Sequence, residues 1–111
     1  YLKKINLKDF KLTFRSKYRA ADIEHKKNSI VPGGLFEISK SDEKKLDVYE
    51  DYQNLYKKFY FYYYGKKVMT YTMISKTPFR FPTERYLNIV KRGYVDCDLD
   101  EKYLKKGLLG I

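Results

Sequence analysis

Glu50 is the residue whose type and position best suit chemistry. It ends a segment, residues 40–50, that is predicted to be a helix, and at about 100° per residue it shares one apolar sector with Leu46 and Tyr49. A carboxylate on an inward face is partly desolvated, and the carbonyl end of a helix disfavours its charge, so both effects raise its pKa. Such a group can act as a general acid or base near neutral pH. The same pattern also fits a Glu50 that faces water or pairs with a lysine.

The helix that would carry Glu50 has a defined start. Ser39 is the expected N-cap, and Asp42, three residues later, is its expected partner in a capping box. Asp42 and Glu43 also place two acids in the first turn, where the helix dipole favours them. The sequence therefore predicts a helix that begins near Lys40.

The segments before this helix are predicted to be strands. Residues 8–15 alternate apolar and polar side chains, as in a strand with one buried face, and residues 1–7 are interpreted as a connector. Residues 18–24 and 30–38 are expected to be two further strands, separated by a polar turn at residues 25–29.

Two adjacent glycines in the third expected strand, Gly33 and Gly34, have two interpretations. They mark a bulge or tight bend, or they let a ligand approach the backbone closely, because glycine has no side chain in the way. They do not belong to a phosphate-binding loop, since no Gly-Lys-Ser/Thr follows. Asp22, in the second expected strand, could bond a ligand amine, although an ordinary turn or edge role is the simpler interpretation.

The second half of the chain is predicted to form a hairpin and two helices. Residues 55–64 and 67–74 are aromatic-rich strands around a turn at Gly65 and Lys66. After a loop, a helix is expected from the N-cap Thr83 to Arg92, with Gly93 as its C′ residue and Tyr86, Leu87, Ile89 and Val90 as its apolar face, and a short last helix covers residues 100–106.

The charge of the chain raises the question of anionic partners. The 24 basic and 14 acidic residues give a net charge of +10, which is typical of proteins that bind nucleic acid or anionic membranes. Tyrosines among lysines could also stack on bases. However, the lysines are dispersed in pairs, and Tyr and Phe are strong strand formers that supply core bulk in a chain without Trp. We therefore expect no nucleic-acid partner, and no membrane partner, because no apolar run approaches ~20 residues.

The single cysteine and single histidine limit other chemistry. Cys97 can form no internal disulfide, which predicts a reducing, cytoplasmic location. One cysteine and one histidine exclude an ordinary zinc site, and His25 falls in a different predicted element from Cys97, so Cys97 is interpreted as a packing residue. No pattern in the sequence defines an oligomeric state.

The stretch from Val31 to Tyr56 resembles the signature of the gamma-glutamylcyclotransferase superfamily, which includes AIG2-like proteins and a cyclotransferase of butirosin biosynthesis. In that family a glycine-rich strand ending in Glu precedes Ser-x-x-Asp/Glu, then Leu-Asp-x-x-Glu, then a Tyr that opens the next strand. The matching residues are Val31, Gly33, Gly34, Leu35, Phe36, Glu37, Ser39, Leu46, Asp47, Glu50 and Tyr56. Residues 9–14, Tyr71 and residues 82–93 extend the similarity.

The resemblance implies an α+β fold, a small mixed β-barrel with peripheral helices, as one domain over residues 1–111. The family begins with a strand and a Tyr-Gly-Ser-Asn loop, whose backbone amides hold the carboxylate of the substrate. Nothing in the chain matches that loop, so we expect the strand and the loop to lie upstream of Tyr1.

The resemblance also implies an activity. The family cyclises a gamma-glutamyl group of a small molecule to 5-oxoproline and releases an amine or amino acid, with no metal or organic cofactor. Carried over residue by residue, Glu50 is the general acid and base, Tyr56 and Tyr86 donate hydrogen bonds or shape the pocket, and Gly33 and Gly34 lie where the backbone meets the substrate. Two alternatives remain: a non-catalytic module that binds a small molecule or protein on the same fold, and a basic nucleic-acid binder.

Overall fold

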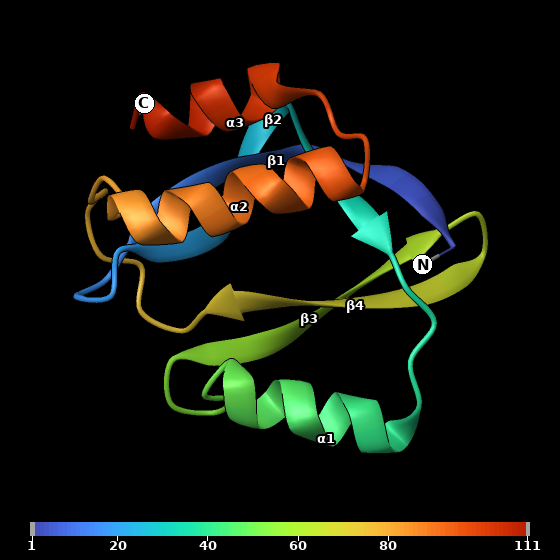
Figure 1. The fold of residues 1–111 in the computed structure, drawn as a ribbon. Coiled ribbons are helices and arrows are strands. Elements are labelled where there is room, and N and C mark those ends of the chain that lie inside the picture. Colours follow the sequence, from blue (N-terminus) through green and yellow to red (C-terminus); the bar gives the residue numbers. More distant parts are fainter. Residues whose placement is uncertain (1, 111) are drawn as a thin grey trace. The chain divides into compact units, whose positions relative to one another are not determined.

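The computed structural model of the chain describes residues 2–110, which fall into two compact units (Figure 1). We call Tyr1–Glu37 with Thr77–Ile111 the terminal unit, and Ile38–Lys76 the central unit. The terminal unit contains β1 (Lys3–Arg15), β2 (Ala20–Leu35), α2 (Glu84–Asp96) and α3 (Glu101–Leu108). The central unit contains α1 (Lys40–Tyr49), β3 (Tyr56–Tyr63) and β4 (Lys66–Met73).

Strand β1 is longer than its alternating pattern predicts. It begins at Lys3, and Lys3–Lys8 pair antiparallel with Ile30–Leu35 of β2, so the connector expected at residues 1–7 is wrong from Lys3 onward. Ile5 is buried while its neighbours Lys3 and Lys4 are exposed. One buried side chain in a lysine-rich run is too weak a pattern to predict a strand, and the pairing with β2 decides the conformation.

Strand β2 is also continuous, so the polar turn expected at residues 25–29 is wrong. The register passes from Lys8 opposite Ile30 to Phe10 opposite His25, which leaves residues 26–29 opposite Asp9 alone. Asn28 has φ 66°, and its N–H donates a 3.0 Å hydrogen bond to the Asp9 carboxylate. The polar residues therefore form a bulge within one strand, where extra residues can leave the ladder without ending it.

The core of the terminal unit lies between β1 and the two C-terminal helices (Figure 1). The buried cluster consists of Leu12 and Phe14 from β1, Tyr94 from α2 and Leu104 from α3. Helix α3 lies so close to β1 that a Cβ atom at Gly107 would be 2.8 Å from the Leu12 carbonyl oxygen. Only glycine permits this approach.

Helix α2 begins at its predicted N-cap, where the Thr83 side chain accepts the Tyr86 N–H, but it does not end at Gly93. It continues to Asp96, and Asp98, at φ 54°, takes the left-handed position after the helix. The extra turn places Tyr94 in the core, where burial raises its pKa to about 12. The gain from burying Tyr94 outweighs the helix-ending preference of the preceding glycine.

The central unit matches the sequence prediction more closely. The Ser39 side chain accepts the Asp42 N–H at 3.0 Å and the Asp42 carboxylate accepts the Ser39 N–H, so both halves of the capping box are formed. Strands β3 and β4 form the expected hairpin, but its turn consists of Tyr64 and Gly65, both with positive φ, one residue before the turn expected at Gly65 and Lys66. A two-residue turn of this kind suits the twist of a hairpin.

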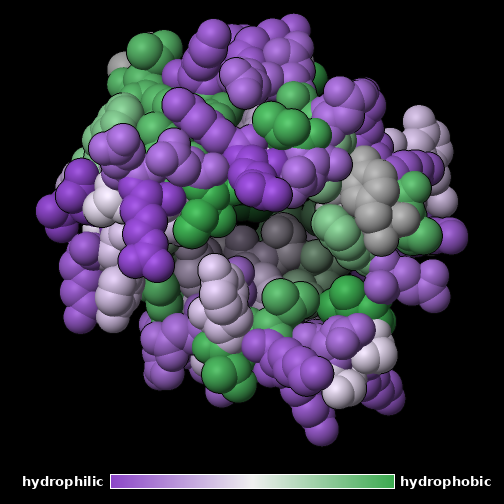
Figure 2. Space-filling view, viewed as in Figure 1, coloured by the Kyte–Doolittle hydropathy of each residue, from purple (hydrophilic) through white to green (hydrophobic). Residues whose placement is uncertain are grey.

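The α+β class is thus confirmed, with two separate two-stranded antiparallel sheets. Among residues 2–110 no closed barrel is found, so the mixed β-barrel that the resemblance implies is not confirmed. Hydrophilic residues occupy most of the face seen in Figure 2, with smaller hydrophobic groups among them. No helix in the described part of the chain is long and apolar enough to cross a membrane.

Gly107→Ala is expected to lower the free energy of unfolding by about 1–3 kcal/mol, because the added methyl group would overlap β1. Gly93→Ala is the matched control, since its Cβ position has no atom within 4 Å and alanine favours an exposed helix by up to about 1 kcal/mol. Urea unfolding of both variants and the wild type measures the difference. Equal stability of Gly107→Ala and wild type would show that α3 can move away from β1 without cost.

Candidate active site

The end of helix α1 fixes the backbone of Glu50. Glu50 is the C-cap residue, and its N–H donates to the Leu46 carbonyl at 2.8 Å. Asp51 follows at φ 51° and donates to the Val48 carbonyl at 3.2 Å, while the Tyr52 N–H reaches the carbonyl of Asp47, the third residue from the end of the helix, at 2.9 Å. This paired arrangement is a Schellman motif, with aspartate in the position that glycine usually occupies.

The Glu50 carboxylate is half-buried, and burial raises its pKa. Among residues 2–110, its side chain forms no hydrogen bond or ion pair. A buried charge that lacks a partner is costly, so the neutral form is favoured relative to an exposed glutamate. The carbonyl end of α1 acts in the same direction. The raised pKa expected from the sequence is therefore present.

The apolar helical face that was expected to bury Glu50 is not present. Tyr49 is 78% exposed and Leu46 is 37% exposed, and α1 has no buried residue. No inward apolar sector therefore carries Glu50. Its burial depends on its place at the helix end, where the chain turns back towards β3, and a helical wheel contains no information about that turn.

A network of charged side chains joins α1 to the hairpin. The Asp47 carboxylate accepts a 2.6 Å hydrogen bond from the Tyr71 hydroxyl of β4 and a 3.1 Å bond from the Lys58 ammonium of β3. Lys58 also lies 2.6 Å from the Glu43 carboxylate. Asp47 is three residues before Glu50, so these bonds hold the last turn of the helix and thereby the position of Glu50.

The pKa values reflect this pairing. The Tyr71 hydrogen bond and the Lys58 ammonium hold the pKa of Asp47 below its ordinary value despite some desolvation. Hydrogen bonds to Glu43 and Asp47 raise the pKa of Lys58, and burial with the Asp47 bond raises that of Tyr71. Every charge in the network is thus stabilised by a partner, in contrast to Glu50.

Lys58 is part of this network, although no sequence motif marks it. Its place is nevertheless implied by the hairpin register, because Lys58 and Tyr71 are directly paired across β3 and β4 and so share one face. The Lys58 ammonium also lies 4.4 Å from the centroid of the Tyr52 ring. An acid at position 47, together with this cross-strand pair, would have indicated the hydrogen bonds from Lys58 and Tyr71 to Asp47.

Of the other predicted site residues, only Tyr56 lies in the same unit as Glu50. Tyr56 opens β3, is buried, and its carbonyl accepts the Gln53 N–H at 2.8 Å. Gly33, Gly34 and Tyr86 belong to the terminal unit. The structure therefore brings Glu50 and Tyr56 together in one unit through the short segment that joins α1 to β3.

In the terminal unit, Tyr86 has a structural contact. Its hydroxyl accepts a 3.0 Å hydrogen bond from the Ala21 N–H, and its ring lies edge-on to Phe14 at 6.4 Å between centroids. Gly33 and Gly34 pair with β1 in regular register, so the bulge expected there is not found. No atom lies within 4 Å of the position that a Cβ of Gly33 would take, which leaves room for close approach to that backbone.

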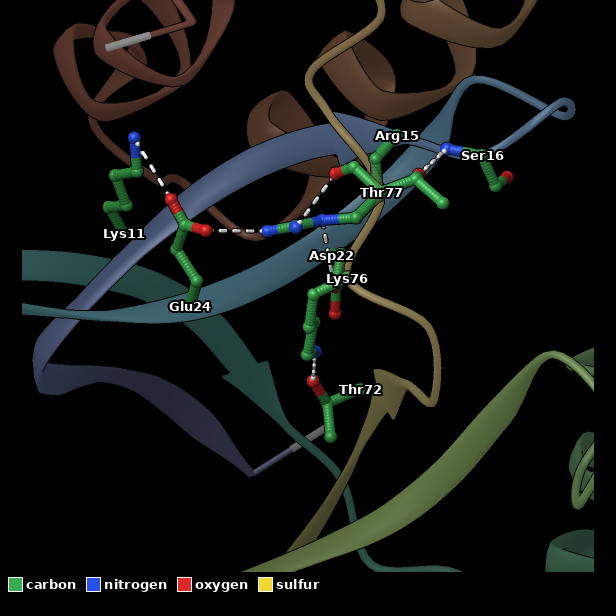
Figure 3. Close-up of polar contacts among 8 residues, drawn as sticks. All are labelled: Lys11, Arg15, Ser16, Asp22, Glu24, Thr72, Lys76 and Thr77. Carbon is green, nitrogen blue, oxygen red and sulfur yellow. Dashed lines mark hydrogen bonds and ion pairs between the residues drawn. The ribbon is translucent and has the colours of Figure 1, made fainter.

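Asp22 is not at a turn and is not available to a ligand amine. It is buried in β2, with its carboxylate 3.1 Å from Nε of Arg15 (Figure 3). The Arg15 guanidinium also donates to Glu24 at 2.6 Å and to the Thr77 carbonyl at 3.0 Å. Burial opposes the charge of Glu24, but hydrogen bonds from Arg15 and Lys11 bring its pKa below the ordinary value. This cluster is a structural ion-pair network.

The remaining candidates for metal or nucleophilic chemistry lie on different elements. Cys97 is the C-cap residue of α2, and His25 lies in β2 with its ring edge-on to Phe10. In the described part of the chain, no three His, Cys, Asp or Glu side chains form a group that could hold a metal ion. The chemistry of the site thus centres on Glu50.

Comparison with protein families matches residues 2–88 to the family described as "Gamma-glutamyl cyclotransferase, AIG2-like". The matched region runs from β1 into the first turns of α2 and contains Glu50, Tyr56 and all three predicted site residues of the terminal unit. Helix α3 lies outside it. No curated protein and no solved structure matches the chain.

Glu50→Gln is expected to make the protein more stable at neutral pH. The pKa of Glu50 is raised above 4.5, so the folded state holds the proton more tightly and wild-type stability falls as pH rises from about 4.5 through the folded pKa. Glutamine carries no charge, so the gain should be present above this interval and absent below about pH 4.

Thermal unfolding of both proteins across that pH range measures the gain. Glu84→Gln, at an exposed glutamate of α2, is the control for the loss of one carboxylate. An equal pH-dependent gain in both variants would show that the burial of Glu50 is not its cause.

Tyr71→Phe is expected to lower thermal stability, because it removes the 2.6 Å hydrogen bond to the Asp47 carboxylate. Tyr62→Phe removes a hydroxyl from a residue of the same hairpin that is 73% exposed, and it should have little effect. In an Asp47→Asn background the loss caused by Tyr71→Phe should shrink. Fully additive losses would mean that the two side chains are not coupled.

Proposed function

This chain belongs to the AIG2-like gamma-glutamyl cyclotransferase family, and we propose that it cyclises the gamma-glutamyl group of a small molecule to 5-oxoproline. In this reaction the α-amine of the gamma-glutamyl group attacks the carbonyl carbon of its own side chain. A new C–N bond closes the five-membered ring, the bond to the former amide nitrogen breaks, and one amine or amino acid is released. Both reacting groups belong to one molecule, so the protein's task is to fold that molecule and move protons.

The observation that carries the proposal is the state of Glu50. Its carboxylate is half-buried, its pKa is raised by burial, and no cation in the described residues holds it in the charged form. A carboxylate in this state is a stronger base than an exposed glutamate and, once protonated, remains a useful acid. The nearby acids Asp47 and Glu43 are paired with Lys58 and lack these properties.

One carboxyl group can carry the proton transfers that the reaction requires. The attacking nitrogen enters as an ammonium and ends as a lactam N–H, so it loses two protons, and the leaving nitrogen gains two as it becomes an ammonium. Glu50 accepts a proton from the attacking nitrogen and returns it to the leaving nitrogen, and then repeats the transfer. These steps require neither electron transfer nor a Lewis acid, so we expect no cofactor.

The other residues are proposed to position the substrate. Tyr56 and Tyr86 would donate hydrogen bonds or shape the pocket, as the family resemblance implies. The open space beside Gly33 supports close approach of the substrate to the β2 backbone, with Gly34 next to it. In this proposal the hydrogen bond from Tyr71 to Asp47 contributes to catalysis indirectly, because it holds the helix end that carries Glu50.

We expect Glu50→Gln to remove turnover, with a loss of about 10²-fold or more, because general acid and base catalysis typically contributes about 10²–10⁴-fold. The measurement is the release of 5-oxoproline, detected by mass spectrometry, from a panel of gamma-glutamyl amino acids and gamma-glutamyl amines. The protein assayed is the one encoded by the full natural reading frame. Glu84→Gln is the matched control and should retain the wild-type rate.

Three outcomes are informative. Loss of activity in folded Glu50→Gln alone would support Glu50 as the base. Wild-type turnover by that variant would remove Glu50 from the mechanism. No release from any compound by the folded wild-type protein would overturn the proposed reaction and favour a non-catalytic binding module.

A further inference from the structure

A cavity in the terminal unit is separate from every residue of the proposed site. Its volume is about 420 Å³, which falls within the usual range for small-molecule sites. The lining comes from β1, β2 and α3 together with Leu109, and it includes neither Glu50 nor Tyr56 nor Tyr86. Leu12, Ile30 and Leu109 supply its apolar part.

One wall of the cavity is the bulge in β2. Lys26, Asn28 and Ser29 line the cavity, and all three belong to the segment that leaves the ladder opposite Asp9. The hydrogen bond from the Asn28 N–H to the Asp9 carboxylate fixes the conformation of that segment. A bulge of this kind redirects side chains that a regular strand would alternate between its two faces. The polar run therefore presents several groups to one space.

The opposite wall is helix α3. Tyr103, Lys106 and Gly107 line the cavity, and the close approach of α3 at Gly107 brings this wall to β1. The Lys106 ammonium lies 5.5 Å from the centroid of the Tyr103 ring, a contact that orients the ammonium. Because α3 lies outside the matched residues 2–88, this wall is not part of the region shared with the family.

The charged side chains that line the cavity are all positive. Lys11, Lys26 and Lys106 line it, and no Asp or Glu does. Lys11 is paired with Glu24 at 3.1 Å, whereas Lys26 and Lys106 form no ion pair with any carboxylate among residues 2–110. Ammonium groups gathered at a hollow raise the local concentration of anions. Several of them favour a phosphate, with its higher charge and three terminal oxygens, over a single carboxylate.

We propose that this cavity binds a small organic phosphate. The lysines hold the phosphate group, Asn28 and Ser29 add hydrogen bonds, and the apolar lining with Tyr103 accommodates the organic part. The site is independent of the proposed cyclisation, because none of its lining residues takes part in that reaction.

The test compares phosphates with counterparts that lack the phosphate group: adenosine has none, and benzoate has a carboxylate in its place. Adenosine monophosphate and phenyl phosphate are titrated into the full chain by isothermal titration calorimetry, beside adenosine and benzoate. We expect the two phosphates to bind about tenfold or more tightly than their counterparts, since charge-assisted bonds dominate. Failure of both phosphates to bind, or equal binding of the counterparts, would overturn the proposal.

A pair of double variants separates a built site from general attraction to a basic surface. Lys26→Met with Lys106→Met removes two cavity lysines and keeps their aliphatic stems, and we expect binding to weaken about tenfold or more. Lys27→Met with Lys105→Met removes the same charge from neighbouring exposed lysines that do not line the cavity, and it should bind as wild type does.

Equal weakening in the two double variants would mean that the net charge of +10, not the cavity, attracts the phosphate, and this would overturn the proposal. Circular dichroism confirms that both variants are folded. Glu50→Gln should bind the phosphates as wild type does, so the phosphate site and the proposed cyclisation can fail separately.

Discussion

The hydrogen bonds that the Asp47 carboxylate accepts from Tyr71 and Lys58 are the interaction on which the candidate active site depends. Helix α1 has no buried residue, so apolar packing alone does not hold it on the hairpin. A surface ion pair is usually worth little, but here a carboxylate, an ammonium and a phenol meet in one network, whose geometry is set by a cross-strand pair. The turn that follows Asp47 places Glu50 at a fixed helix end.

The carboxylates of this protein differ in whether a cationic side chain pairs with them. Asp22 and Glu24 in the terminal unit are matched to Arg15, and Asp47 in the central unit to Lys58. The fold depends on these pairs because removal of one partner would leave the other charge uncompensated. Glu50 has no such partner in the described residues, and its pKa is raised, whereas the pKa values of Glu24 and Asp47 are lowered. Folding destabilises the charged form of such a carboxylate, and groups of this kind are found in active sites.

The bulge in β2 keeps a run of polar residues within one continuous strand. The polar run at residues 26–29 interrupts the pairing of β2 with β1 without ending the strand, because Asp9 satisfies the backbone of Asn28. The same run then faces helix α3 across a cavity lined by lysines. The local backbone geometry of the bulge thus creates a cavity wall that is far from Glu50 in the sequence and takes no part in the proposed reaction.

The sequence by itself determined the features that depend on neighbours along the chain. The caps at Ser39 and Thr83, the β3–β4 hairpin and the family signature through Glu50 all follow from contacts or motifs that span a few residues. The tertiary structure alone decided the continuity of β2, the extra turn of α2 and the burial of Glu50 without an apolar helical face. Those features depend on pairing and burial between segments far apart in the chain, and short-range periodicity carries no information about such contacts.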